Sequence, residues 1–273
     1  MTGQPITLTV NGVALEACWY GPPPHQSLTL VLLHEGLGSV GQWKHFPEQL
    51  ARTTGCGVLV YSRAGYGQSD PVALPRPLTY MHNEARDVLP RLLDAAHIRD
   101  AVLVGHSDGA SIALINAGTQ QDPRIKGLVL MAPHVFTEPM CLASIRDART
   151  AYEDTATHLR DRLAHYHRHV DVAFKGWNDA WLDPDFESWN LEGFVGGITG
   201  PMLLIQGRQD EYGTHKQLDA IVRRAQTTCE ILWLDDCRHS PHRDQPEATL
   251  AAIQDFIQPL FQSASTQETF THG

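Results

Sequence analysis

The sequence lacks the cysteine pattern of a disulfide-rich or zinc-binding protein. Its five cysteines, Cys18, Cys56, Cys141, Cys229 and Cys237, are scattered and form no CxxC pair. A disulfide framework and a structural zinc site are therefore not expected, and a reducing, cytoplasmic location is the simplest interpretation.

Positive charge and long apolar runs are also scarce. The chain has 21 Lys and Arg residues against 31 Asp and Glu residues, for a net charge of −10. An acidic chain without basic runs is poorly suited to bind nucleic acid or an anionic membrane. No apolar run reaches the roughly 18 residues of a membrane helix, and no basic segment precedes an apolar stretch at the start, so no signal peptide is expected. We expect no nucleic-acid or membrane partner, and either a monomer or a homodimer.

Apolar runs and helical patterns alternate along most of the chain. Hydrophobic residues make up 42% of the 273 positions and charged residues 19%, as in ordinary globular proteins with a sizeable core. Several runs are apolar almost throughout, as in strands that are buried on both faces. The alternation predicts an α/β fold with a doubly wound, mostly parallel sheet. After an N-terminal segment that alternates like a strand, the predicted strands are 28–34, 57–62, 101–106, 127–133, 202–207 and 229–235; the predicted helices are 42–53, 80–97, 108–119, 214–226 and 246–260.

The alternation stops between residues 134 and 200. This region is charged and helical in its first half, and then becomes rich in tryptophan. It could be a plain connector, but a long connection in a compact domain is more often a functional lid. We therefore predict a helical cap over 134–200, a core formed by 1–133 and 201–262, and a flexible polar tail over 263–273.

A serine stands between two glycines directly after the predicted strand 101–106. The segment reads Gly105-His106-Ser107-Asp108-Gly109. Small residues two positions before and after the serine let a strand and the following helix approach closely. A strand before and a helix after are the context of a nucleophile elbow rather than of an ordinary turn. Ser107 is therefore the candidate nucleophile.

A serine hydroxyl needs a base, and the base needs a carboxylate that orients it. In an α/β sheet such groups gather beyond the carboxyl ends of the strands. Asp210 follows the next-to-last predicted strand, with Glu211 as the alternative. His239 follows the last strand, with His242 as the alternative. The sequence therefore predicts Ser107, Asp210 and His239 as a catalytic set.

The chain order Ser, Asp, His resembles that of the α/β-hydrolase superfamily. Three further segments are similar to superfamily motifs: LLHEGLGSVGQW at 32–43, YSRAGYGQSDP at 61–71 and RHSPHRDQPE at 238–247. The resemblance covers almost everything from residue 5 to residue 261, and it makes 134–200 similar to the superfamily's helical cap.

The resemblance implies a role for each matching residue. Ser107 would be the nucleophile, His239 the base and Asp210 the orienting acid. The oxyanion hole would use the backbone N–H of Asp108 and that of Gly36 or Leu37.

Three positions depart from the superfamily pattern, and one of them, Ala64, only replaces the first glycine of the turn after the strand at 57–62. Glu35 stands where glycine is frequent. A carboxylate that faced an oxyanion would oppose catalysis, so we expect Glu35 to turn away and pair, or to bind part of the substrate. Arg238 precedes the candidate base where glycine is usual, and its charge would disfavour a protonated His239 unless Asp235, Asp236 or Asp244 neutralises it.

Other candidate residues have both a structural and a functional interpretation. Asp108 could be a solvated carboxylate at a helix start, or could grip a cationic or amino group of a substrate. The cap tryptophans could form its core, or could face the pocket. The candidate pocket residues are Glu35, His134, Trp177, Trp181 and Trp189. The other cap histidines, His158, His165, His167 and His169, are expected to be surface or core residues.

Together these features predict a serine hydrolase that cleaves a small carboxylic ester through an acyl-serine intermediate. Its partner would be a small-molecule ester or acyl substrate. No metal or organic cofactor is expected, because the sequence has neither a metal-spaced cluster nor a GxGxxG at the first strand–helix turn. The alternatives are a C–C bond hydrolase of ring-cleavage diketones, a cofactor-free dioxygenase or perhydrolase, and a non-catalytic ligand receptor, because a fold alone does not select its chemistry.

Overall fold

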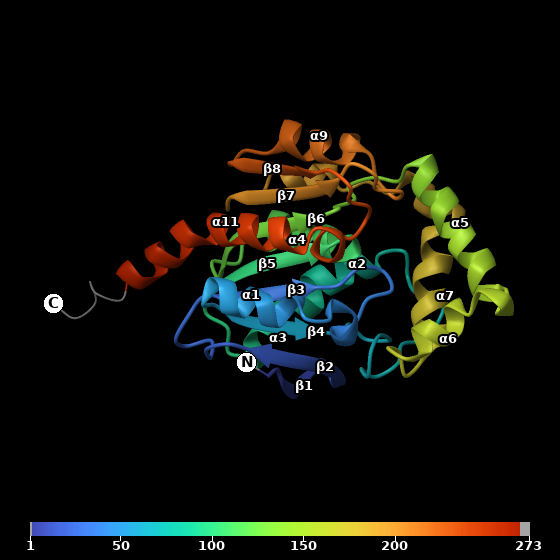
Figure 1. The fold of residues 1–273 in the computed structure, drawn as a ribbon, viewed down its shortest axis with the longest axis horizontal. Coiled ribbons are helices and arrows are strands. Elements are labelled where there is room, and N and C mark those ends of the chain that lie inside the picture. The colour runs from blue at the N-terminus through green and yellow to red at the C-terminus, as the bar shows by residue number, and fades with distance from the viewer. Residues whose placement is uncertain (1, 268–273) are drawn as a thin grey trace.

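The computed structural model describes residues 2–267, with side chains up to residue 260. Eight strands form one sheet in the order β1-β2-β4-β3-β5-β6-β7-β8 (Figure 1). Strands β3 to β8 are parallel, whereas β2 is antiparallel to β1 and to β4. The predicted α/β fold with a mostly parallel sheet is therefore confirmed. The strands are β1 (Gln4–Val10), β2 (Val13–Tyr20), β3 (Thr29–Leu33), β4 (Gly57–Tyr61), β5 (Ala101–His106), β6 (Ile125–Met131), β7 (Met202–Gly207) and β8 (Cys229–Leu234).

The N-terminal segment forms a hairpin rather than the single strand that its alternation suggests. Asn11 and Gly12 connect β1 to β2, and both have positive φ, 54° and 79°. Two central residues with positive φ define the type I′ turn, whose twist matches that of the flanking strands. The Asn-Gly pair was the signal for this turn.

Helices cover both faces of the sheet because its central strands are apolar on both sides. In β3, Leu30 and Leu32 pack into one hydrophobic cluster, and Val31 and Leu33 into the other. Helices α1 and α11 cover the first face, and α2, α3, α4 and α9 cover the second. The core helices are α1 (Phe46–Thr54), α2 (Tyr80–Asn83), α3 (Leu89–Ala95), α4 (Asp108–Gln120), α9 (His215–Arg224), α10 (Pro241–Asp244) and α11 (Pro246–Gln267), with short turns η1 (Val40–Trp43) and η2 (Glu84–Val88).

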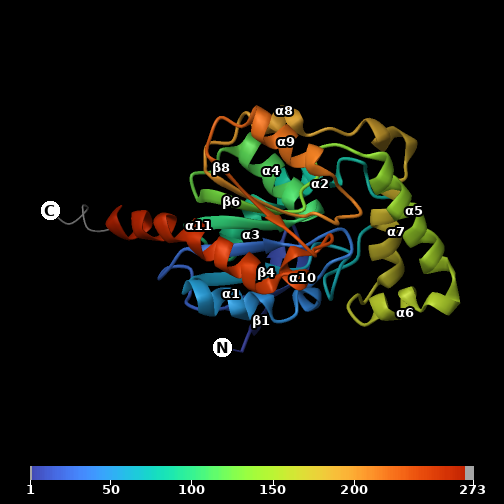
Figure 2. The same ribbon diagram turned by 45° about the horizontal axis from the view of Figure 1, so that its top comes forward.

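Residues 134–200, here named the helical insertion, lie between β6 and β7. The insertion contains α5 (Pro139–Glu153), η3 (Thr155–Thr157), α6 (Leu159–Ala164), α7 (Val170–Trp181), η4 (Pro184–Ser188) and α8 (Glu192–Val195). Helices α5, α6 and α7 stand beside the carboxyl ends of the parallel strands, apart from the layered core (Figures 1 and 2). In contrast, α8 packs against α4 and α9 of the core.

The last helix extends into the segment that was predicted as a tail. The backbone of residues 263–267 continues α11. The segment contains neither glycine nor proline that would end a helix. Residues 268–273 of the predicted tail lie outside the described residues.

The strand order reverses beside β3, because β4 lies on one side of it and β5 on the other. Ligands of open α/β sheets bind beyond the carboxyl ends of the strands at such a reversal. The loop after β3 and the turn after β5 meet there.

Candidate active site

Ser107 occupies a strained turn between β5 and α4. Its backbone angles are φ 53° and ψ −117°, a combination that residues with a Cβ atom rarely adopt. The flanking glycines allow the close approach that this turn requires. A Cβ on Gly105 would lie 2.5 Å from the Cα of Ala110, and one on Gly109 would lie 2.0 Å from the carbonyl oxygen of Leu33. Because both clashes are with backbone, no larger residue fits at either position.

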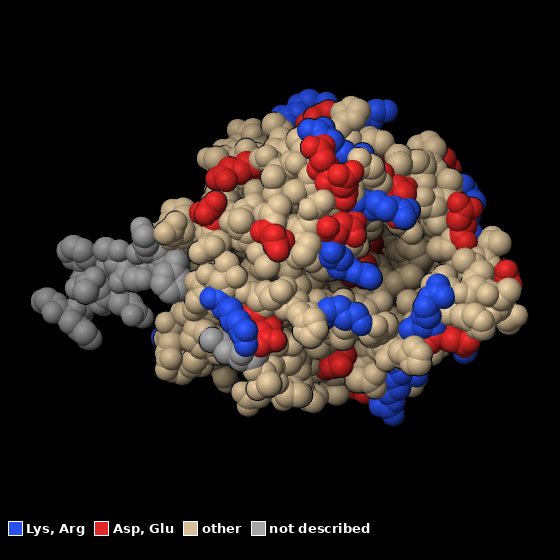
Figure 3. All heavy atoms as spheres, viewed as in Figure 1, with Lys and Arg blue, Asp and Glu red and all other residues tan. Residues whose placement is uncertain are grey.

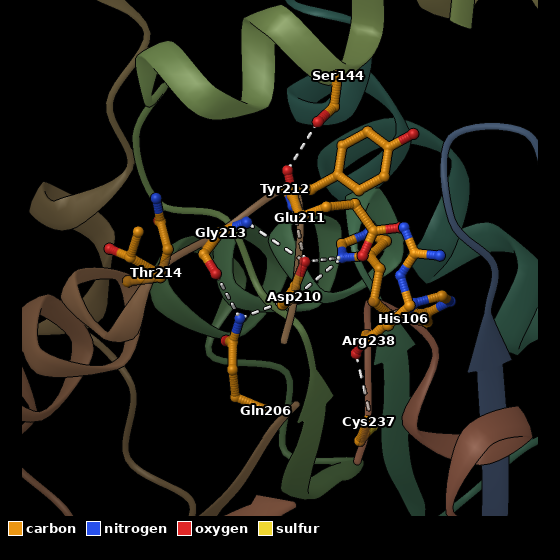
Figure 4. Close-up of polar contacts among 12 residues, drawn as sticks. His106, Ser144, Gln206, Asp210, Glu211, Tyr212, Gly213, Thr214, Cys237 and Arg238 are labelled. Carbon is orange, nitrogen blue, oxygen red and sulfur yellow. Dashed lines mark hydrogen bonds and ion pairs between the residues drawn. The ribbon is translucent and has the colours of Figure 1, made fainter. Parts of the chain in front are cut away.

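Asp210 and His239 are joined by a hydrogen bond between the loops that follow β7 and β8. The Nδ1–H of His239 donates to Asp210, with Nδ1 lying 2.8 Å from Oδ1 and 3.0 Å from Oδ2. Asp210 also accepts from the backbone N–H of Tyr212 and the side-chain amide of Gln206, each at 2.8 Å (Figure 4). A carboxylate can only accept, so Nδ1 carries the proton and Nε2 of a neutral His239 presents a lone pair.

This pairing shifts the pKa of both partners. Burial acts to lower the pKa of His239, but the charge of Asp210 and its hydrogen bond raise that pKa above its ordinary value. Burial acts to raise the pKa of Asp210, but the neighbouring His239 and the hydrogen bonds lower it. Asp210 is therefore a carboxylate that stabilises a proton on His239.

The two alternative residues have other contacts. Glu211 forms an ion pair with Arg238 at 3.0 Å. His242 packs against the ring of Trp43, with the centroids 4.7 Å apart. The structure thus brings Asp210, rather than Glu211, to the candidate base.

Among the described contacts, the Arg238 guanidinium pairs with none of the three aspartates considered from the sequence. Its guanidinium pairs with Glu211, which lies on the neighbouring loop. Asp235 pairs instead with Arg208 at 2.8 Å, and Asp244 accepts from the backbone N–H of Arg238 at 2.9 Å. Asp236 makes no ion pair within the described residues. The distance along the sequence does not show which carboxylate a long arginine side chain reaches.

The loop after β3 is held by buried hydrogen bonds. Nδ1 of His34 donates to the carbonyl of Glu35 at 2.7 Å, and its Nε2 accepts from the backbone N–H of Arg63 at 3.1 Å. The Arg63 guanidinium donates to the carbonyls of His34 and Glu35, at 2.5 and 3.1 Å. The backbone N–H groups of Gly36 and Leu37 make no hydrogen bond to any described residue. They are therefore free to bind a ligand.

Glu35 turns its carboxylate toward His106. Its Oε2 lies 3.6 Å from His106 Nδ1, and the Glu35 side chain is 25% exposed. Burial acts to raise the pKa of Glu35, but contact with His106 and the nearby His34 and His242 hold it well below its usual range. Glu35 is therefore ionised.

Asp108 is buried, so its interpretation as a solvated carboxylate is wrong. Only 1% of the residue is exposed. Its oxygens accept hydrogen bonds from the hydroxyl of Tyr80 at 2.6 Å and from the indole N–H of Trp181 at 3.2 Å. The buried guanidinium of Arg63 lies 3.9 Å away. Burial raises the pKa of Asp108, and the charge of Arg63 opposes this rise.

Ser107 and His239 face one small cavity of about 100 Å³. Figure 3 shows the molecule hollowed between the core and the insertion. No hydrogen bond joins Ser107 to His239 among the described contacts, so each side chain is available to a ligand. The cavity is lined by Glu35, Gly36, Leu37, Ser107, Asp108, His134, Cys141, Ile145, Trp177, Trp181, Tyr212 and His239.

The cavity includes most of the predicted pocket residues and several that the sequence did not reveal. Trp189 does not line it; its ring packs on Phe186 and Trp181, with centroids 5.2 and 5.6 Å apart, so its prediction as a pocket residue is wrong. Tyr212 lines the cavity two positions after Asp210, a spacing that could have identified it. Cys141 and Ile145 lie one turn apart on α5, which only the packing of that helix reveals.

His134 lies beside the candidate base without being bonded to it. The two ring centroids are 5.6 Å apart. Burial and the neighbouring His239 lower the pKa of His134 to about 3. His134 is therefore neutral and contributes a polar but uncharged wall.

Residues 30–253 match the model of the alpha/beta hydrolase family. The chain belongs to this family. The sn-1-specific diacylglycerol lipase ABHD11 of Danio rerio is 24% identical to this hydrolase in an alignment of 258 positions, which covers 85% of this chain and 79% of the relative.

Two solved structures share the fold. Naproxen esterase of Bacillus subtilis has a TM-score of 0.71 at 16% identity, covering 94% of this hydrolase and 92% of the esterase. The 2-hydroxy-6-oxo-6-phenylhexa-2,4-dienoate hydrolase of Rhodococcus sp. strain RHA1 has a TM-score of 0.73 at 17% identity, covering 94% of this chain and 100% of its own. At these identities the likeness shows the fold alone.

Hydrogen bonds tie the insertion of this hydrolase to the loops after β3, β5 and β7. Trp181 donates to Asp108 in the turn after β5. The hydroxyl of Ser144 donates to the carbonyl of Glu211 at 2.8 Å, in the loop after β7 (Figure 4). Nδ1 of His167 accepts from the N–H of Gly67 at 3.0 Å, so its Nε2–H donates to the carbonyl of Leu37 at 2.8 Å.

His167 was expected to be a surface or core residue, and the structure gives it a more specific place. It is 2% exposed and links the insertion to the loop that carries Gly36 and Leu37. Nothing in its sequence context separates it from the neighbouring histidines, because the contact spans 130 positions.

Two further properties concern the described part of the chain. None of its helices is both long and apolar enough to cross a membrane. In the same residues, no three His, Cys, Asp or Glu side chains come together in a way that could hold a metal ion.

Proposed function

We propose that this hydrolase cleaves a small carboxylic ester through an acyl-serine intermediate. The observation that carries the proposal is the hydrogen bond from His239 Nδ1 to Asp210, which leaves Nε2 available beside the cavity that contains Ser107. This is the arrangement that activates a serine hydroxyl.

The reaction would proceed in two halves. Ser107 Oγ attacks the ester carbonyl while His239 Nε2 takes its proton. The tetrahedral intermediate then collapses, and His239 gives this proton to the departing alcohol oxygen. In the second half, His239 takes a proton from water as the water oxygen attacks the acyl-serine. Collapse returns the proton to Ser107 and releases the carboxylic acid.

Backbone amides would stabilise the negative charge on the intermediate. The N–H of Asp108 is the first in α4 and has no acceptor within the helix. It lines the cavity together with Gly36 and Leu37, whose amides are also unbonded. Each donor of this kind contributes roughly 3 kcal/mol to the stabilisation of a transition state.

The cavity favours a short acyl group. Its volume of about 100 Å³ is smaller than the roughly 150 Å³ of an apolar cavity that holds benzene. Its lining contains no Lys or Arg side chain, and this argues against an anionic substrate such as a ring-cleavage dienoate. Ester hydrolysis is therefore the better-supported of the two reactions.

The test is hydrolysis of p-nitrophenyl esters, from acetate to octanoate, by the wild type and by Ser107→Ala. We expect kcat/KM to peak at acetate to butanoate, to fall as the chain lengthens, and to be lost in the variant. A fluorophosphonate probe should label the wild type at Ser107 and leave His239→Ala unlabelled. A folded wild type that neither reacts with the probe nor exceeds Ser107→Ala on any ester would contradict the proposal.

A further inference from the structure

The charge of the cavity beside Ser107 is unbalanced. Two carboxylates line it, Glu35 and Asp108, and its lining contains no Lys or Arg side chain. Asp108 is matched by Arg63 at 3.9 Å and by hydrogen bonds from Tyr80 and Trp181. The unmatched charge is therefore that of Glu35.

The carboxylate of Glu35 receives no hydrogen bond from any described residue. Its nearest ionic partner, His106 Nδ1, lies 3.6 Å away, which is longer than a hydrogen bond. His106 Nε2 lies 2.7 Å from the carbonyl oxygen of His239 and must donate to it. The other ring nitrogen, Nδ1, has no hydrogen-bond partner among the described residues. This carboxylate therefore needs a positive partner, and a quarter of its side chain is exposed.

Aromatic rings complete the wall around this charge. Trp177, Trp181 and Tyr212 all line the cavity. The indole of Trp177 lies directly over the next residue of the loop, since a Cβ on Gly36 would be 2.2 Å from its Nε1. Aromatic faces attract ammonium groups, most strongly when the site is desolvated, and tryptophan does so best. A carboxylate without a donor beside tryptophan rings suits an organic cation.

We infer that the substrate is an ester that carries an ammonium group, bound by the Glu35 carboxylate and the ring of Trp177. This inference rests on the proposed function, because it places the cation next to the ester carbonyl that Ser107 attacks. The cavity of about 100 Å³ limits the separation of the two groups to a few bonds. Glu35 would be a specificity residue that contacts the substrate, and the acid in this loop would serve recognition without taking part in proton transfer.

Two pairs of isosteric esters test the inference. The first pair places the cation on the acyl side of the ester, and the second places it on the alcohol side. Methyl β-alaninate is compared with methyl butanoate, which replaces the ammonium by a methyl group. Acetylcholine is compared with 3,3-dimethylbutyl acetate, which replaces nitrogen by carbon. Acid release is followed by pH-stat titration. We expect kcat/KM of the wild type to be at least tenfold higher for the cationic member of one pair.

The variant Glu35→Gln keeps the shape of the side chain and removes its charge. We expect it to reduce the cationic-to-neutral ratio to near one, mainly through KM, while hydrolysis of the neutral ester persists. Glu187→Gln is the matched control, because this exposed glutamate of η4 does not line the cavity. It should keep the wild-type ratio. A wild-type ratio near one in both pairs, or a high ratio that survives in Glu35→Gln, would overturn the inference while leaving ester hydrolysis established.

A binding measurement covers the cases in which Glu35→Gln does not fold or no ester is cleaved. Tetramethylammonium is titrated into Ser107→Ala while tryptophan fluorescence is recorded, with tert-butanol as the neutral control. We expect a saturable change with the cation alone, because two tryptophans line the cavity. Absence of a saturable change would overturn the inference independently of any activity.

Discussion

Trp181 of the insertion and Asp108 of the nucleophile turn are joined by a buried hydrogen bond of 3.2 Å, although 73 positions separate them in the sequence. Tyr80 completes the contact: its hydroxyl donates to Asp108 at 2.6 Å and accepts from the Trp181 N–H at 3.0 Å. The turn that carries Ser107 is thus held by the core and by the insertion at once. Together with the contacts of Ser144 and His167, this makes the insertion part of the framework that positions the site.

The first prediction concerns Tyr80. Tyr80→Phe removes the hydroxyl that donates to the buried Asp108 carboxylate. We expect the free energy of unfolding to fall by about 1–3 kcal/mol, because a buried charge loses a donor. Urea denaturation measures the change.

Tyr66→Phe is the matched control for that experiment. The hydroxyl of Tyr66 is buried and has no hydrogen-bond partner among the described residues. Its removal costs no hydrogen bond, so stability should be unchanged or slightly higher. Equal destabilisation by the two variants would show that the contact between Tyr80 and Asp108 contributes nothing specific.

The second prediction concerns the pH dependence of the reaction. A general base must be unprotonated, and the charge of Asp210 raises the pKa of His239 above its ordinary value of about 6.5. We therefore expect kcat/KM to increase with pH along a limb whose midpoint lies above 6.5. At pH values below this midpoint His239 is protonated and cannot accept the Ser107 proton.

Asp210→Asn should change both the position and the height of this limb. Without the carboxylate, burial lowers the pKa of His239, so the midpoint moves to lower pH. The plateau should fall by about 10⁴-fold, as when the orienting carboxylate of a serine protease is replaced. A plateau that falls without any movement of the midpoint would contradict the assigned electrostatic role of Asp210.

The parallel strands and the triad candidates could be predicted because their signals are local. Each buried strand is a short apolar run, and Ser107, Asp210 and His239 each follow such a run directly. In an open α/β sheet, ligands bind beyond the carboxyl ends of the strands, so functional groups are expected directly after them. The position of each residue relative to its strand was therefore sufficient to bring Asp210 and His239 together in the prediction.

The sequence could not predict the contacts between distant segments. The reach of Arg238 to Glu211, the burial of Asp108 under Tyr80 and Trp181, and the place of Trp189 away from the cavity depend on how the insertion packs on the core. Such packing is decided by side-chain shape over many residues, and no spacing along the chain encodes it. Cys141 and Ile145, which line the cavity from α5, are of this second kind.

The last prediction uses the strain at Ser107. Its φ of 53° and ψ of −117° are unfavourable for any residue with a Cβ, at a cost of about 1–3 kcal/mol. Glycine avoids this cost but loses about 0.4–1 kcal/mol through the greater freedom of the unfolded chain. We therefore expect Ser107→Gly to be more stable than Ser107→Ala by about 1 kcal/mol in urea denaturation, with both variants inactive. At Ser111, inside α4, the order should reverse, because glycine in a helix interior is less stable than alanine by about 0.5–1 kcal/mol. Comparison of the two sites separates backbone strain from helix propensity. If the alanine variant were the more stable one at both sites, the turn at Ser107 would store no strain. The geometry that exposes the Ser107 hydroxyl would then cost this hydrolase no stability.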